Sequence, residues 1–183
     1  MSGSTDSPDI HFIPVTEADY PMLRGWLESP PMNEWWGEPD RELGRICDKV
    51  EGRDTTRPFI FFHNGEPAGY IQYWFVSDEV DAGHAAETTW LLKVPREAVG
   101  VDLSLGRPEL LGRGVGTAVL RKFLAMLIEE GHEIITIDPD ETNKRAIRAY
   151  EKVGFIPFGR YPGDRGTTLL MKLDRERFRE TAG

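Results

Sequence analysis

Three glycines, each two residues from the next, lie where a strand-rich region gives way to a long helical pattern. Gly112 and Gly114 directly precede an apolar periodicity over residues 115–130, and Gly116 lies in its first turn. The first turn of a helix carries backbone N–H groups without acceptors and the positive end of the helix dipole, so it favours anions. Glycines let such a ligand approach the main chain without a steric clash. This pattern predicts a phosphate-binding loop, and a turn that only packs the helix is the alternative.

Two familiar nucleotide-binding motifs do not fit this loop. The Rossmann pattern needs a glycine where Thr117 stands, and the Walker A pattern needs a Gly-Lys-Ser/Thr sequence that is absent. The loop therefore predicts a pyrophosphate cradle of another kind.

Residues 111–116, Leu-Gly-Arg-Gly-Val-Gly, resemble the acyl-CoA signature Gln/Arg-x-x-Gly-x-Gly/Ala of the GNAT acetyltransferases. Leu111 departs from that signature, which affects a side-chain contact and not the backbone cradle. Residues 138–139, Asp-Pro, and 143–155, Asn-Lys-Arg-Ala-Ile-Arg-Ala-Tyr-Glu-Lys-Val-Gly-Phe, look like the family's downstream strand-to-helix segment. The resemblance implies the GNAT fold, an α/β arrangement in which a mixed, mostly antiparallel sheet is flanked by helices and splayed at the acetyl-CoA site.

The resemblance also implies acetyl-CoA as co-substrate. In such enzymes the loop holds the pyrophosphate, the pantetheine pairs with the preceding strand, here 101–105, and an asparagine at the later helix start binds the cofactor. Carried over, the cofactor-binding residues are Leu103, Leu105, Arg113, Gly114, Val115, Gly116, Thr117 and Asn143. The family's tyrosine that protonates the leaving thiolate corresponds to Tyr150, for which packing between helix and sheet is the alternative.

Within the family, four segments resemble the aminoglycoside 6′-N-acetyltransferases. They are residues 34–37 (Glu-Trp-Trp-Gly), 64–70 (Asn-Gly-Glu-Pro-Ala-Gly-Tyr), 100–105 (Gly-Val-Asp-Leu-Ser-Leu) and 138–139. The resemblance implies a polycationic antibiotic as acceptor, acetylated by direct attack of an amine, and hence a role in antibiotic resistance.

Amine acetylation needs a base, because an alkylammonium is mostly protonated at pH 7. Asp102 lies on the strand that should flank the acetyl group, and Asp138 ends the next strand, so we expect both carboxylates at the gap between them. Asp102 is the predicted base and, with Asp138, a ligand for acceptor amines. Backbone N–H groups near Leu103 should stabilise the tetrahedral oxyanion. Turn or cap roles are the structural alternatives.

Aromatic residues could supply flat walls for sugar rings and cationic amines. Trp35, Trp36 and Tyr73 are the predicted walls, with Trp74 beside them, although core packing is equally compatible with their positions. Glu87, in the irregular segment 76–98, is a further predicted acceptor ligand. That segment departs from the acidic cluster of the antibiotic-modifying group, because Lys93 and Arg96 follow Glu87.

The elements that must position these residues follow from periodicity and turn signals. We predict strands at 10–15, 58–63, 68–75, 99–105, 133–137, 155–160 and 167–173, and helices after Thr16, through 43–50, and at 115–130 and 143–153. Asn64-Gly65 predicts a tight hairpin turn, and Pro162-Gly163 a second turn. Residues 30–39 read as a break, and 76–98 as a functional loop or lid. Cys47 is expected to pack beside the core.

Composition bounds the remaining possibilities. The 183 residues carry 31 acidic and 22 basic side chains, a formal charge of −9, which argues against a nucleic-acid partner. No apolar run reaches the roughly 20 residues of a membrane span, so we expect no membrane partner and a cytoplasmic location. Scattered histidines predict no metal site. We expect a flexible tail at 1–9, one domain at 10–174, a C-terminal tail at 175–183, and a monomer or homodimer.

Two kinds of alternative stay open at this point. The cofactor-binding motifs do not specify the acceptor amine. A siderophore hydroxylysine, a polyamine or a protein N-terminus could therefore replace the aminoglycoside. A catalytically silent acyl-CoA-binding domain would keep Gly114 and Gly116 without using the acid and base.

Overall fold

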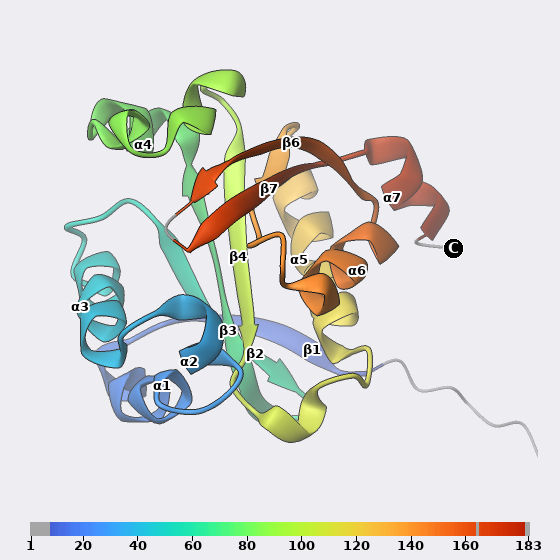
Figure 1. The fold of residues 1–183 in the computed structure, drawn as a ribbon. Helices are drawn as coiled ribbons and strands as arrows, with labels where there is room; N and C mark the ends of the chain where they lie inside the picture. The colour runs from blue at the N-terminus through green and yellow to red at the C-terminus, as the bar shows by residue number, and fades with distance from the viewer. Residues whose placement is uncertain (1–7, 164, 182–183) are drawn as a thin grey trace, which may run out of the picture.

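The computed structural model describes residues 8–163 and 165–181, and within them seven strands form one sheet (Figure 1). The strand order is β1-β2-β3-β4-β5-β7-β6. All neighbouring pairs are antiparallel except β4 and β5. The strands are β1 (Ile10–Pro14), β2 (Arg57–His63), β3 (Glu66–Phe75), β4 (Val99–Leu105), β5 (Ile135–Ile137), β6 (Phe155–Gly163) and β7 (Gly166–Leu173).

Helices cover both faces of this sheet (Figure 1). Val15, Ile60 and Tyr70 pack against the first group, and Phe123 anchors the second against β1, β2 and β3. The first group comprises α1 (Tyr20–Leu27), α2 (Met32–Trp36) and α3 (Pro39–Val50); the second comprises α5 (Val115–Glu129) and α6 (Lys144–Lys152). The predicted fold class is confirmed.

The hairpin between β2 and β3 forms as predicted. Asn64 and Gly65 have φ values of 52° and 81°, the left-handed pair that a two-residue type I′ turn requires. This turn sets the pairing at the tip of the hairpin, and a bulge between Phe61 and Phe62 shifts the β2–β3 register by one residue beyond it. β4 pairs with β3 along its whole length, from Val99 opposite Phe75 to Leu105 opposite Gly69.

The parallel pair β4–β5 is short. Only Val99 with Ile135 and Gly100 with Thr136 are in register, although β4 continues to Leu105. Beyond Gly100 the two strands diverge, and the gap opens toward the start of α5. The predicted splay is thus present at the predicted place.

Two segments are more ordered than the sequence predicts. Residues 30–39, expected as a break, contain α2, and 76–98 fold into α4 (Val76–Asp81) and two short 3-10 turns. The second segment is packed rather than open, because Trp90 and Leu91 are each only 2% exposed and join a small core with Val76 and Leu170. Pro162 and Gly163, expected in a turn, instead belong to β6.

The two expected tails differ from the prediction where the structure describes them. Residues 1–7 lie outside the described residues, and Asp9 is tied to Asn64 by hydrogen bonds in both directions, of 3.1 and 2.8 Å. The C-terminal tail prediction is wrong for α7 (Arg175–Thr181), a helix that Asp174 caps and that buries Phe178. A single apolar residue in a polar segment gave too weak a periodicity to predict this helix.

Gly154 connects α6 to β6 and lies against α7. Its φ is 105°, and a Cβ there would lie 2.8 Å from the Phe178 backbone nitrogen. Gly154→Ala should therefore lower the free energy of unfolding by about 2–4 kcal/mol, from backbone strain and steric overlap together. Urea unfolding measures the change. Gly25→Ala, at an exposed position of α1 where a Cβ would have no atom within 4 Å, is the matched control and should be neutral or slightly stabilising. Equal stability of the two variants would contradict the prediction.

Candidate active site

The glycine loop leads directly into α5. Gly112 and Gly114 have φ values of 72° and 79°, so the backbone itself requires glycine at both positions. Gly116 differs, because its φ is ordinary and no protein atom lies within 4 Å of a Cβ placed there. Nothing in the fold requires glycine at 116, whereas a ligand on the first turn of α5 would. The N–H groups of that turn lack intrahelical acceptors, as an anion cradle needs.

A cleft of about 400 Å³ runs from this loop along β4 to α6. Seven of the eight predicted cofactor-binding residues line it: Leu103, Leu105, Gly114, Val115, Gly116, Thr117 and Asn143. Arg113 is exposed and lies outside the lining. Leu111 also lines the cleft, at the position where the loop departs from the acyl-CoA signature.

Backbone donors of β4 face the gap between the strands. The Val99 N–H donates toward β5, to Ile134 at 3.0 Å, and the Gly106 N–H donates toward β3, to Ala68 at 2.9 Å. Because N–H directions alternate along a strand, the N–H groups of Leu103 and Leu105 point away from β3 into the gap. β5 has ended there, so an extended ligand could pair with these groups.

A second cleft, of about 320 Å³, adjoins the first on the side of α3. We call it the acceptor cleft; Lys49, Gln72, Asp102 and Asp138 are among its lining residues. Trp35, Leu103, Asn143 and Tyr150 line both clefts, so the two spaces meet at these four side chains. Asn143 also caps α6, since its Oδ1 accepts from the Ala146 N–H at 3.1 Å.

Asp102 is held by two donors on one oxygen. Its Oδ2 accepts from Gln72 Nε2 at 2.7 Å and from Trp74 Nε1 at 3.0 Å. No hydrogen bond to Oδ1 is found within the described residues, so that oxygen is available to a molecule in the cleft. Burial raises the pKa of Asp102 above its ordinary value, and the two donors and the charge of Lys49 oppose that rise.

Asp138, from the end of β5, lines the same cleft. Burial and the charge of Asp102 raise the pKa of Asp138 well above its usual range. Like charges at one site favour a shared proton. Asp102, which has two donors, is therefore the carboxylate that ionises more readily, and Asp138 is the one that more readily keeps a proton.

Tyr150 projects from α6 to the junction of the clefts and is 8% exposed. Burial, followed by the charges of Asp102 and Asp138, raises its pKa above the ordinary value of tyrosine. The phenol therefore stays protonated over the working pH range, as a proton donor must. The structure brings the three predicted side chains Asp102, Asp138 and Tyr150 to one cleft.

Tyr73 is not part of this site, and its prediction as a substrate wall is wrong. It packs on the opposite face of the sheet, with ring centroids 6.2 Å from Phe123, 6.4 Å from Phe59 and 5.5 Å from His132. Side chains alternate between faces along a strand, so Gln72 and Trp74 face the site and Tyr73 faces α5. Alternation along β3 contained this information, because Tyr73 directly follows Gln72, the residue that pairs with Asp102.

Gln72 and Lys49 are site residues that the sequence reasoning missed. Gln72 was detectable, because it lies opposite Asp102 in the antiparallel register. Lys49 gave no such signal, since the α3 sequence does not reveal which turn of that helix meets the sheet.

An outer cleft of about 650 Å³ opens beyond the acceptor cleft and holds the remaining predicted residues. Trp35 and Trp36 line it from α2, Asp138 from the sheet, and Glu87 from the segment after α4. It also contains arginine side chains, namely Arg41, Arg45 and Arg165. The wall is therefore mixed in charge rather than uniformly acidic.

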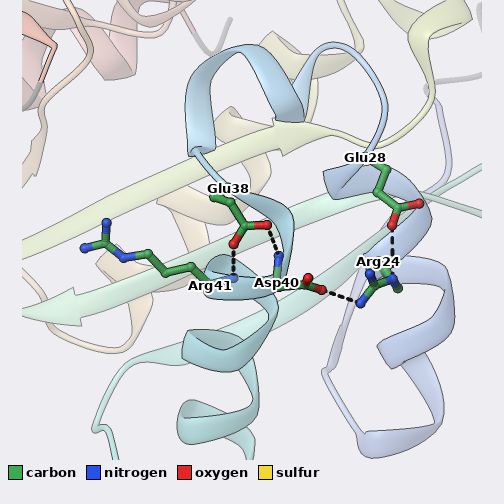
Figure 2. A network of polar contacts seen from close by, with 5 residues as sticks. All are labelled: Arg24, Glu28, Glu38, Asp40 and Arg41. Carbon is green, nitrogen blue, oxygen red and sulfur yellow. Dashed lines mark hydrogen bonds and ion pairs between the residues drawn. The ribbon is translucent and has the colours of Figure 1, made fainter.

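A polar network joins α1 to the start of α3, the two helices on either side of α2 in the chain (Figure 2). Glu38 caps α3 by accepting from the N–H groups of Asp40 and Arg41, at 3.0 and 2.8 Å. Arg24 of α1 pairs with Glu28 at 3.0 Å and with Asp40 at 2.5 Å, which ties α1 to the start of α3. The Arg41 guanidinium points away from this network (Figure 2). The exposed pairs contribute little stability each, but the cap determines where α3 begins.

Known proteins are similar to this chain in sequence and architecture. The family described as "Acetyltransferase (GNAT) domain" matches residues 15–161. The aminoglycoside N(6′)-acetyltransferase type 1 of Klebsiella pneumoniae is 31% identical, over 99% of this chain and 90% of that protein. A structure of AAC(6′)-Ib with ribostamycin and coenzyme A has 30% identity and a TM-score of 0.80, covering 96% of this chain and 98% of that one.

A second solved structure gives the same result. The aminoglycoside acetyltransferase AAC(6′)-Ib in complex with coenzyme A and kanamycin has 29% identity and a TM-score of 0.79, covering 96% of this chain and all of that one. The loop, the splayed strands and the family match agree, and the chain belongs to the GNAT acetyltransferase family.

Proposed function

We propose that this protein is an acetyl-CoA-dependent aminoglycoside 6′-N-acetyltransferase and confers antibiotic resistance. One observation carries the proposal: a cleft lined by a glycine cradle meets a cleft lined by two carboxyl groups, and Tyr150 lies at their junction. Relatives named for this activity, and related structures that hold aminoglycosides with coenzyme A, support the acceptor class. The acetyl-CoA requirement agrees with a cytoplasmic location.

The residues of the first cleft fit acetyl-CoA, which supplies the acetyl thioester when bound. The first turn of α5, from Val115 to Thr117, would hold the pyrophosphate through backbone N–H groups. The Leu105 N–H would donate to an amide carbonyl of the pantetheine, as in an added strand, which leaves the Leu103 N–H for the acetyl end of the cofactor. Asn143, already a helix cap, would orient the chain end near Tyr150.

The transfer needs one base, one oxyanion donor and one acid. Asp102 Oδ1 removes a proton from the acceptor ammonium, and the freed amine attacks the thioester carbonyl carbon to form the new C–N bond. The Leu103 N–H donates to the oxyanion that develops on the carbonyl oxygen. As the C–S bond breaks, Tyr150 protonates the leaving thiolate, and the new amide nitrogen releases its extra proton, which restores the Tyr150 phenol through solvent. No protein nucleophile takes part.

The rest of the acceptor would occupy the outer cleft. Trp35 and Trp36 offer aromatic faces to sugar rings and cationic amines, and Asp138 and Glu87 offer carboxylates to further amines. The arginines of this cleft limit how many positive charges it accepts at once. We therefore propose acceptors that place their most basic end toward Asp102.

Thiol release from acetyl-CoA, measured against aminoglycosides, polyamines, hydroxylysine and ribosomal N-terminal peptides, tests the proposed function. We expect turnover with 6′-amino aminoglycosides and none with analogues that carry a 6′-hydroxyl group. Turnover confined to another amine would identify one of the alternative acceptors. Tight CoA binding without turnover on any acceptor would instead identify a silent acyl-CoA-binding domain.

Gly116→Val tests the cofactor cradle without disturbing the fold, because its φ is ordinary and its surroundings are open. The valine side chain would project into the cleft, so we expect CoA affinity to fall at least about tenfold, the effect of roughly 1.4 kcal/mol. Calorimetry gives the dissociation constant. Gly25→Val, on α1 outside the clefts, is the control. Unchanged CoA affinity in a folded Gly116→Val protein would contradict the cradle.

Asp102→Asn tests the base. Gln72 and Trp74 both donate to Oδ2, so the asparagine carbonyl must face them and its NH₂ group faces the cleft, where a base is needed. We expect kcat to fall at least about a hundredfold. Wild-type kcat/KM should decline as pH falls through the pKa of Asp102, which lies above its ordinary value. The Asp102→Asn variant should not show this decline of kcat/KM at low pH.

The matched control for the base is Asp81→Asn. Asp81 is an exposed carboxylate at the end of α4 and pairs with Arg96. It should leave kcat and the pH profile at wild-type values. Near-wild-type kcat in Asp102→Asn with an unaltered profile would transfer the role of base to Asp138 or Glu87.

Tyr150→Phe tests the acid. Loss of proton donation should lower kcat by about ten- to a thousandfold while both substrates still bind. Tyr73→Phe is the control, since that tyrosine lies on the other face of the sheet and should be silent. Equal kcat in the two variants, with chemistry rate-limiting, would leave Tyr150 as a packing residue.

A further inference from the structure

A lysine ammonium lines the acceptor cleft, although the acceptor proposed above is itself a cation. Lys49 lies in the last turn of α3, and its Nζ donates to Gln72 Oε1 at 2.8 Å. It is partly buried, and burial lowers its pKa. Three carboxylates oppose that effect, those of Asp102, Asp54 and Glu42. The Lys49 ammonium repels an incoming acceptor ammonium, so its presence in the acceptor cleft requires an explanation.

The contacts of Gln72 supply one part of that reason. Its Oε1 accepts from Lys49 and also from the Tyr70 hydroxyl at 2.6 Å, so both acceptor sites of the oxygen are in use. The amide orientation is therefore fixed, and Nε2 must donate to Asp102 Oδ2, at 2.7 Å. A flipped Gln72, only 6% exposed, would turn its NH₂ group toward the Lys49 ammonium and its carbonyl oxygen toward the Asp102 carboxylate.

The charges around Asp102 supply the second part. Arg45 pairs with Glu42 at 2.7 Å, which leaves its charge compensated. Asp138 and Tyr150 contribute either negative charge or none. The ionisable groups that line the acceptor cleft with Asp102 are Glu42, Arg45, Lys49, Asp138, Asp140 and Tyr150; Tyr70 lies behind Gln72, and Asp54 acts on Lys49 and Tyr70. Lys49 is thus the cation in this set that acts on Asp102.

We propose that Lys49 is a positioning residue of the transfer reaction: it fixes the Gln72 amide that holds Asp102 and supplies the positive charge that keeps Asp102 ionised before the acceptor arrives. This inference rests on the proposed function, in which Asp102 is the base. Lys49 reaches Asp102 through Gln72 on the Oδ2 side, so Oδ1 stays free for the acceptor. The negative end of the α3 dipole favours a cation at this helix end.

The test measures the ionisation of Asp102 directly, without an acceptor. Carbon NMR of protein with ¹³C-labelled aspartate carboxyl groups follows each titration, and Asp102→Asn identifies the Asp102 signal by its loss. Lys49→Met removes charge and donor, Lys49→Gln keeps a donor without charge, and Lys49→Arg keeps the charge. We expect the Asp102 midpoint to rise by about one pH unit or more in Lys49→Met and Lys49→Gln, and to return toward wild type in Lys49→Arg.

The kinetic counterpart is the acid limb of kcat/KM, which should move to higher pH by the same amount in the two uncharged variants. Lys93→Met, an exposed lysine outside the clefts, is the control. An Asp102 titration midpoint in Lys49→Gln equal to that of the wild type would overturn the proposal. So would a midpoint in Lys49→Arg as high as that in Lys49→Met. If Lys49→Met does not fold, the Gln and Arg variants decide. Because the titration needs no acceptor, failure to acetylate aminoglycosides would refute the proposed function separately.

Discussion

The early end of one parallel strand pair is the constraint on which the site depends. β4 and β5 stay in register for two residue pairs and then separate, although β3 continues to hold β4. The N–H groups of Leu103 and Leu105 therefore face a gap instead of a neighbouring strand. Unpaired backbone donors in a sheet interior are costly. A ligand that pairs with them gains what the missing strand would have supplied, and α5 and α6 surround that same gap.

Burial of charge is the second constraint, and it gives the site its chemistry. Two carboxyl groups and one phenol line the acceptor cleft, and desolvation raises the pKa of all three. The protein differentiates them by the hydrogen bonds it provides. Asp102 has two side-chain donors and a nearby ammonium, Asp138 has a backbone hydrogen bond opposed by burial and by the charge of Asp102, and Tyr150 retains its proton. One environment thus yields a base and an acid.

The outer cleft distinguishes this chain from a uniformly acidic receptor for polycations. Arg165 and Arg41 line it together with Glu87 and Asp140. The neighbouring Lys49 continues this mixture into the acceptor cleft. Mixed charge lowers the overall electrostatic attraction for a polycation. It favours binding of an acceptor whose individual amines contact individual carboxylates. Acceptor specificity would therefore depend on how the spacing of the acceptor's amines matches the carboxylates of the cleft, as well as on the acceptor's total charge.

The sequence by itself determined the parts of the protein that local chemistry controls. The glycine loop before an apolar helix, the Asn64-Gly65 turn and the Asp102 strand act over a few residues, and each is found at its predicted place. Tertiary structure decided what depends on two distant segments meeting. It buried Phe178 against Gly154, turned Tyr73 away from the site, and brought Lys49 of α3 to Gln72 of β3. No periodicity encodes such meetings, because helix packing sets them through the shape of the whole core.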